Sequence, residues 1–189
     1  MTEILTDEYR LTLRMTKEPD EKAVGRFLKE TGDGDLTRLL IEKEMQFSAM
    51  ESCTSGLCAG MLTDVEGASA VFKGSFVTYS NEAKIRAGVP AETIRTYGVY
   101  SPETAAAMAK AAKESFGSDI ALGVTGSFSN VDKNNPDSVA GEIHIAVITQ
   151  ETELSALLTM RRLDMTRAEM KRLTASVALK LTALAVSQG

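Results

Sequence analysis

Two short polar segments of this chain contain the side chains best suited to chemistry. The first runs Glu51-Ser52-Cys53-Thr54-Ser55-Gly56, and the second runs Thr78-Tyr79-Ser80-Asn81-Glu82-Ala83-Lys84. Each lies between an apolar, strand-like segment and a helix-like one, which is where open α/β sheets bind their ligands. The two segments therefore predict an enzyme.

The first segment combines nucleophiles with the expected start of a helix. The first turn of a helix has free backbone N–H groups and the positive end of the helix dipole, which suit a phosphate or a developing oxyanion. Three hydroxyls and the thiol of Cys53 could supply a nucleophile or a hydroxyl clamp. The same residues also fit a structural interpretation, in which Ser and Thr cap the helix and Cys53 packs in the core.

The second segment places Tyr79 and Lys84 just past the end of a strand. A lysine normally keeps its proton up to pH ~10, but desolvation or a nearby cation lowers its pKa enough for it to act as a base. The alternative is a solvated Lys84 paired with Glu82 or Glu92. The common nucleophile and nucleotide signatures, G-x-S-x-G, the P-loop and G-x-G-x-x-G, do not occur.

The histidine and cysteine counts limit the chemistry further. His144 is the only histidine, so two-histidine metal motifs are excluded. It lies in a strand-like run, and we favour a structural role over a general-base role for it; a hydrolase would then need another base. The only cysteines are Cys53 and Cys58, which excludes a disulfide framework and a four-cysteine zinc site. We expect no metal.

Composition places the chain among globular proteins of one domain. It has 189 residues, of which 43% are hydrophobic and 25% are charged. The net charge of −5 argues against a nucleic-acid partner, because phosphate binding usually needs a basic patch. No apolar run approaches the ~18 residues of a membrane span. The acidic N-terminus is unlike a signal peptide, so we expect a cytoplasmic protein with no membrane partner.

The order of the expected elements predicts the fold. Residues 1–34 are a polar N-terminal extension that either forms a strand or helix on the core or stays loose. Residues 35–189 then alternate between helical and strand periodicity, which predicts a three-layer α/β/α sandwich around a mixed, mostly parallel sheet. Helices are expected at 35–44, 57–65, 81–86 and 102–116 and from Thr166 onward, and strands at 45–50, 72–79, 119–124, 142–149 and 153–160.

An ordered set of motifs resembles the CinA C-terminal domain family, which includes nicotinamide mononucleotide deamidases. The set begins with Glu51–Gly56, continues with Leu62-Thr63-Asp64-Val65-Glu66-Gly67-Ala68-Ser69, and then with Phe76–Lys84. Gly88–Thr93, Tyr97–Ser101 and Val124-Thr125-Gly126 follow the same pattern in the same order. The likeness covers roughly Asp35 to Ser187, and the ordered set is far more specific than any single motif.

The resemblance implies hydrolysis of the amide of nicotinamide mononucleotide, or of a related pyridine nucleotide, to nicotinic acid mononucleotide and ammonia. It implies Ser52 as the nucleophile, Lys84 as its base and Tyr79 as an assisting group. It implies no metal or organic cofactor, a small-molecule nucleotide as substrate, and a homodimer. Further residues are assigned to substrate binding: Thr54, Ser55, Gly56, Asn81, Thr125, Gly126 and Asn130.

The chain departs from the family pattern at two places. Ser55 stands where the family has the first of two glycines, and a Cβ there could narrow the approach of a phosphate or change the turn. The glycine-rich loop expected after Gly126 is replaced by a run in which Phe128, Asn130 and Asp132 fill the space. Either this loop binds the substrate through side chains or the substrate differs. The alternative function is a catalytically silent CinA-like domain that binds a nucleotide or a protein. Longer members of the family have a separate N-terminal domain, for which residues 1–34 are too few.

Overall fold

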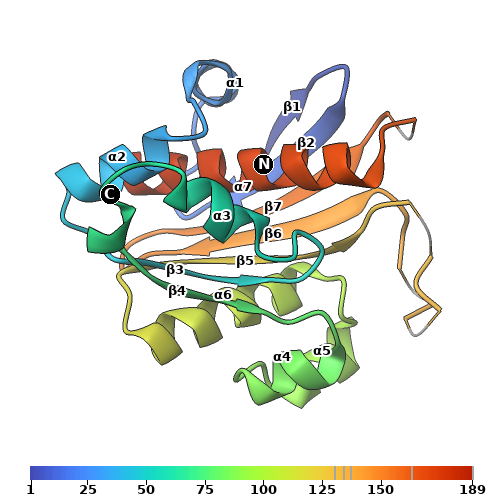
Figure 1. The fold of residues 1–189 in the computed structure, drawn as a ribbon. Coiled ribbons are helices and arrows are strands. Elements are labelled where there is room, and N and C mark those ends of the chain that lie inside the picture. The colour runs from blue at the N-terminus through green and yellow to red at the C-terminus, as the bar shows by residue number, and fades with distance from the viewer. Residues whose placement is uncertain (130, 134, 137, 163, 189) are drawn as a thin grey trace.

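A single seven-stranded sheet organises the molecule (Figure 1). The computed structural model describes residues 1–129, 131–133, 135–136, 138–162 and 164–188. Across the sheet the strand order is β1-β2-β7-β6-β5-β3-β4. The strands are β1 (Thr2–Leu5), β2 (Tyr9–Met15), β3 (Phe47–Glu51), β4 (Phe72–Val77), β5 (Ile120–Ser127), β6 (Glu142–Ile148) and β7 (Glu153–Met160).

Helices cover both faces of the sheet, which confirms the predicted three-layer α/β/α class (Figure 1). One face carries α1 (Glu21–Glu30), α2 (Asp35–Glu42), α3 (Leu57–Thr63) and α7 (Arg167–Ser187). The other carries α4 (Asn81–Arg86), α5 (Ala91–Tyr97) and α6 (Pro102–Phe116), and a short 3₁₀ helix, η1 (Ala68–Ala70), precedes β4. No helix in the described part of the chain is long and apolar enough to cross a membrane.

The sheet is mixed as predicted, but the expectation that it is mostly parallel is wrong. Among the named strands the β3–β4 and β3–β5 pairs are parallel, while β1–β2, β2–β7, β5–β6 and β6–β7 are antiparallel. A parallel connection needs a crossover of a dozen or more residues, usually a helix. The described residues between β5 and β6 and between β6 and β7 include no helix, and these strands run back alongside their neighbours.

The first 34 residues contribute two strands and a helix. β1 and β2 form an antiparallel pair that extends the sheet beyond β7. The alternating residues Tyr9, Leu11 and Leu13 are buried, and α1 lies against α7. Residues 9–15 therefore form a strand of the main sheet, with alternate side chains turned into the core.

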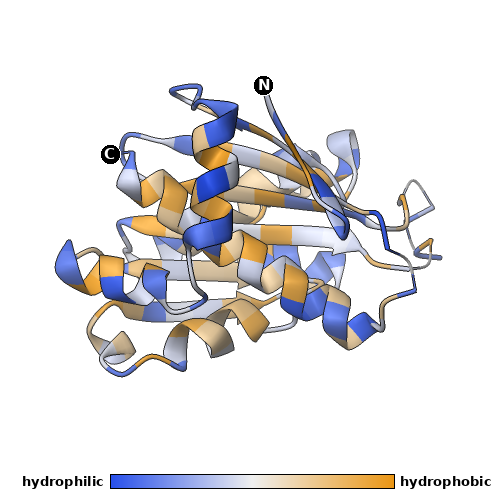
Figure 2. Ribbon diagram, turned by 90° about the horizontal axis from the view of Figure 1, so that it is seen from above, coloured by the Kyte–Doolittle hydropathy of each residue, from blue (hydrophilic) through white to orange (hydrophobic). Residues whose placement is uncertain are grey.

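Apolar residues form one cluster on each side of the sheet. Figure 2 shows hydrophobic residues along the strands and hydrophilic residues gathered on loops and outer helix turns. On the α6 side the packing is unusually close at Gly123 in β5. A Cβ at this position would come within 2.1 Å of the carbonyl oxygen of Ala105. Only glycine therefore lets α6 lie this near to the strand.

The parallel strands bring the two polar segments together. β3 ends at Glu51 and β4 ends at Val77, and both strands run in the same direction as β5. The carboxyl ends of parallel neighbours lie at one edge of a sheet, so the residues that follow them share a crevice there.

Candidate active site

A cavity of about 780 Å³ lies at this edge of the sheet. Its volume is within the range of small-molecule sites. Its lining comes from the segments after β3 and β4, the segment before α6, the end of β5, the β5–β6 loop and the start of α7. The lining residues are Ser52, Cys53, Tyr79, Ser80, Asn81, Glu82, Lys84, Val99, Tyr100, Gly126, Ser127, Val131, Asp132, Lys133, Asn135 and Arg167.

Ser52 and Lys84 meet in this cavity. The Nζ of Lys84 donates to the Oγ of Ser52 at 3.0 Å and to the carbonyl oxygen of Thr78 at 2.9 Å. Both side chains are almost inaccessible to solvent, with Lys84 1% and Ser52 5% exposed. The interpretation of Lys84 as a solvated surface residue is therefore wrong, because its ammonium group is buried against a hydroxyl and a carbonyl.

Burial sets the acid–base behaviour of Lys84. Desolvation disfavours its charged form and lowers its pKa to about 8, although Cys53 and Asp132 act in the opposite direction. At pH 7 roughly a tenth of the molecules then carry the neutral amine. Lys84 can therefore exchange protons with Ser52 near neutral pH. The neighbouring Cys53 thiol is a poor nucleophile, since burial raises its pKa to about 12.

Ser52 is presented by a strand end followed by a tight turn. Its N–H donates to Val124, which continues the β3–β5 pairing by one residue, and its carbonyl oxygen accepts from the N–H of Ser55. Ser55 and Gly56 both have positive φ, 53° and 88°. The serine that replaces the family glycine thus keeps the left-handed turn. Its side chain is exposed to solvent outside the cavity lining and does not narrow the cavity.

The first turn of α3 does not offer free N–H groups, contrary to the expectation from sequence. The side chain of Glu51 is fully buried and accepts hydrogen bonds from the N–H groups of Gly56, Cys58 and Ala59 at 2.9–3.0 Å. Ser75 Oγ donates to the same carboxylate at 3.3 Å. An oxyanion or phosphate could use this helix end only by displacing Glu51. The N–H groups at the start of α3 therefore hold the side chain of Glu51, which ties the turn after β3 to the helix.

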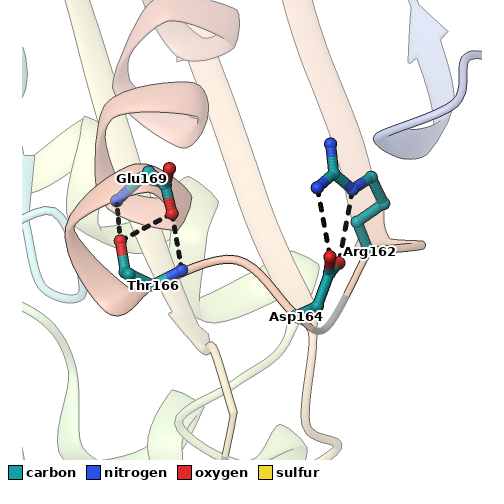
Figure 3. A network of polar contacts seen from close by, with 4 residues as sticks. All are labelled: Arg162, Asp164, Thr166 and Glu169. Atoms are coloured by element: carbon teal, nitrogen blue, oxygen red, sulfur yellow. Dashed lines mark hydrogen bonds and ion pairs between the residues drawn. The ribbon is translucent and has the colours of Figure 1, made fainter.

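Arg167 places a cation at the cavity and was missed by the sequence reasoning. Its guanidinium lies 5.4 Å from the ring centroid of Phe128, and its Nη2 donates to the hydroxyl of Tyr79 at 2.9 Å. The helix predicted from Thr166 onward begins with a capping box, in which Thr166 and Glu169 are bonded reciprocally (Figure 3). This cap fixes the helical turn that carries Arg167.

The family model described as the CinA C-terminal domain matches residues 30–186. This chain belongs to that family. Its relatives include the CinA-like protein of Citrifermentans bemidjiense, which is 43% identical over 123 residues, covering 65% of this chain and 30% of that protein. The CinA-like protein of Chlorobium limicola is 34% identical over 163 residues, covering 82% of this chain and 38% of that protein.

Solved structures of CinA proteins share the fold. The competence/damage inducible protein CihA from Agrobacterium tumefaciens matches with a TM-score of 0.69 and 34% identity, covering 83% of this chain and 97% of that one. The CinA superfamily protein of Escherichia coli matches with a TM-score of 0.73 at 22% identity, covering 90% and 95%. The chain spans about a third of the length of these two curated relatives.

The remaining site residues predicted from the CinA resemblance divide into three groups. Asn81, Gly126 and Tyr79 line the cavity, although Tyr79 is 62% exposed and its hydroxyl bonds Arg167. Four residues are not part of the lining: Thr54, Ser55, Gly56 and Thr125. The hydroxyl of Thr125, for example, donates to the carbonyl oxygen of Val99 inside the protein. Asn130 lies outside the described residues.

In the loop that departs from the CinA pattern, Phe128 and Asp132 lie in different surroundings. Phe128 is fully buried in the core, so it does not fill the cavity as expected. Asp132 lines the cavity and accepts hydrogen bonds from Tyr100 and Asn135. His144 lies in β6, paired with Thr125, and is not in the cavity lining, which supports its structural role. In the described residues no cluster of His, Cys, Asp or Glu is arranged to hold a metal.

Proposed function

We propose that this domain is an amidohydrolase that converts nicotinamide mononucleotide, or a closely related pyridine nucleotide, to the corresponding acid and ammonia. The observation that carries the proposal is the 3.0 Å contact between Lys84 Nζ and Ser52 Oγ on the wall of a ligand-sized cavity. A nucleophile and its base must lie within hydrogen-bond reach, and this pair does. Membership of the CinA family, and the resemblance to its deamidases, supports the choice of substrate.

In the first half-reaction the neutral amine of Lys84 takes the proton of Ser52 as Oγ attacks the carboxamide carbon. The carbonyl oxygen becomes an oxyanion in the tetrahedral intermediate. Lys84, now an ammonium, returns the proton to the amide nitrogen, the C–N bond breaks and ammonia leaves. The product of this step is an ester between Ser52 and the nicotinoyl group.

The second half-reaction regenerates the enzyme. The neutral Lys84 takes a proton from a water molecule that attacks the ester carbon. The bond between that carbon and Ser52 Oγ breaks, and Oγ receives the proton back from Lys84. The sum is amide plus water giving acid plus ammonia, with no redox change and one lysine serving both steps.

The cations at the cavity are suited to the phosphate of the substrate. Arg167 and Lys133 both line it. A guanidinium binds two phosphate oxygens at once, whereas an ammonium acts as a point charge. Arg167 is already oriented by Tyr79 and Phe128, so less side-chain entropy is lost when it binds an anion.

Incubation of the purified protein with nicotinamide mononucleotide tests this function through ammonia release. We expect steady release by the wild type and loss of release in Ser52→Ala, because that variant has no nucleophile. Glu114→Ala, which changes an exposed residue of α6, is the matched control and should keep the activity. Stabilisation of the wild type by the nucleotide without any ammonia would instead favour the silent nucleotide-binding domain.

A further inference from the structure

The helix that carries Lys84 has little apolar packing to hold it. All six residues of α4 are described, and only Lys84 is buried among them. The one large apolar residue of the helix, Ile85, is 42% exposed. A surface helix is normally held by an apolar stripe that packs on the core. Other contacts must therefore keep α4, and with it the Nζ of Lys84, beside Ser52.

Side-chain hydrogen bonds supply these contacts. Among the described residues, Lys84 and Asn81 are the two α4 residues whose side chains bond to another segment of the chain. The Nδ2 of Asn81 donates to the Oδ1 of Asn135 in the β5–β6 loop at 3.1 Å. Asn81 is the first residue of α4, so this bond ties the N-terminal end of the helix to the opposite wall of the cavity.

The β5–β6 loop fixes the side chain of Asn135. Its Nδ2 donates to Asp132 Oδ2 at 2.7 Å, and the same oxygen accepts from the hydroxyl of Tyr100 at 2.7 Å. The backbone of Asn135 is held as well, because its N–H donates to the carbonyl oxygen of Asp132 and its carbonyl oxygen accepts from the N–H of Ser138. Both ends of the Asn135 amide are thus used, one within the loop and the other on α4.

We propose that Asn135 is a positioning residue for the amide hydrolysis, which holds α4 so that Lys84 stays within reach of Ser52. This inference rests on the proposed function and adds to it a residue that acts through Lys84. In the loop that departs from the CinA pattern, the side chain of Asn135 then serves α4. Asn81 is the anchor on α4, in place of the substrate contact predicted from the resemblance.

Asn135→Ala tests this role through the split between kcat and KM. A base that is placed less exactly transfers its proton more slowly, and a misplacement of about 1 Å can cost about 10²-fold. We expect kcat for nicotinamide mononucleotide to fall about 10-fold while KM changes by less than about 2-fold. Val139→Ala is the matched control and should keep both constants, since Val139 is an exposed residue of the same loop outside the cavity lining.

A double-mutant cycle separates positioning from substrate contact. If Asn81 and Asn135 act through their shared bond, Asn81→Ala should also lower kcat about 10-fold, and the double variant should lose no more than either single one. A loss of about 100-fold in the double variant, or a raised KM in Asn81→Ala, would overturn the positioning role in favour of separate contacts with the substrate.

Hydrogen exchange in α4 measures the same contact without turnover. The N–H groups of Lys84 and Ala87 donate to the carbonyl oxygens of Ser80 and Ala83, and they exchange when the helix opens. We expect exchange about 2- to 10-fold faster in Asn135→Ala, as loss of one hydrogen bond allows, and unchanged in Val139→Ala.

The two measurements together decide the inference. Unchanged exchange in Asn135→Ala would overturn the hold of the loop on α4. Faster exchange with the kcat of the wild type would overturn its role in catalysis. A wild type that releases no ammonia would overturn the proposed function, and the positioning role with it, even where exchange in α4 responds to Asn135→Ala.

Discussion

Lys84→Met is expected to lower the kcat for amide hydrolysis by about 10³-fold, within the range for loss of a general base. Methionine keeps an unbranched apolar chain in the space that Lys84 fills, so the protein should fold. It also removes a buried amine, so stability should not fall for electrostatic reasons. Ammonia release under saturating substrate measures the effect, and Lys110→Met in α6, an exposed lysine, is the matched control.

The pH dependence of the wild-type hydrolysis rate is a second test of Lys84 as the base. The base is active only when neutral, and the pKa of Lys84 is lowered to about 8. The rate should therefore rise about tenfold per pH unit below pH 8 and level off above it. A flat profile between pH 6 and 9, or Lys84→Met activity close to that of the wild type, would exclude Lys84 as the base.

Glu51→Ala is expected to destabilise the fold by about 3–5 kcal/mol. Three backbone N–H groups at the start of α3 would lose their buried acceptor, and each unsatisfied buried donor costs about 1–3 kcal/mol, less where water enters. The turn that presents Ser52 would lose its anchor at the same time. The midpoint of urea unfolding, converted with the slope of the transition, measures this loss.

Glu114→Ala is the control for this prediction too, because Glu114 is an exposed glutamate with only a long ion-pair contact. Its substitution should leave the unfolding midpoint almost unchanged. An equal effect of the two substitutions would show that the carboxylate of Glu51 does not anchor α3.

Local patterns predicted much of the fold. The predicted bounds of α6, 102–116, match the structure, as does the predicted helix start at Thr166, because Ser101, Gly117 and the capping box at Thr166 are local signals of a few neighbouring residues. The direction of the strands was predicted less well. The direction depends on whether a helix connects two strands, and the sequence of the β5–β6 segment, whose strands are antiparallel, shows no helical periodicity. The helix at Ala91–Tyr97 was missed, since none of its residues is fully buried and it lacks an apolar stripe.

In the site, too, local motifs were predictive and long-range contacts were not. The motif order predicted that Ser52 and Lys84 act together, and the structure places them in contact. The sequence predicted free N–H groups at the start of α3, but the N–H of Gly56 donates to the carboxylate of Glu51, a contact that only the folded backbone brings about. Arg167 lies 115 positions after Ser52, and nothing in its local sequence marks it as part of the cavity. Long-range contacts of this kind depend on the sheet topology and not on spacing.

Detection of a covalent intermediate on Ser52 is the most direct test of nucleophilic catalysis in this domain. The protein is mixed with nicotinamide mononucleotide and quenched with acid within the first turnover, because acid protonates Lys84 and stops further breakdown of the ester. Peptide mass mapping should then find the nicotinoyl nucleotide attached to the peptide that contains Ser52, and no adduct in Ser52→Ala. Release of ammonia by a protein that never carries the adduct, or an adduct on Cys53 in its place, would contradict a serine nucleophile activated by Lys84.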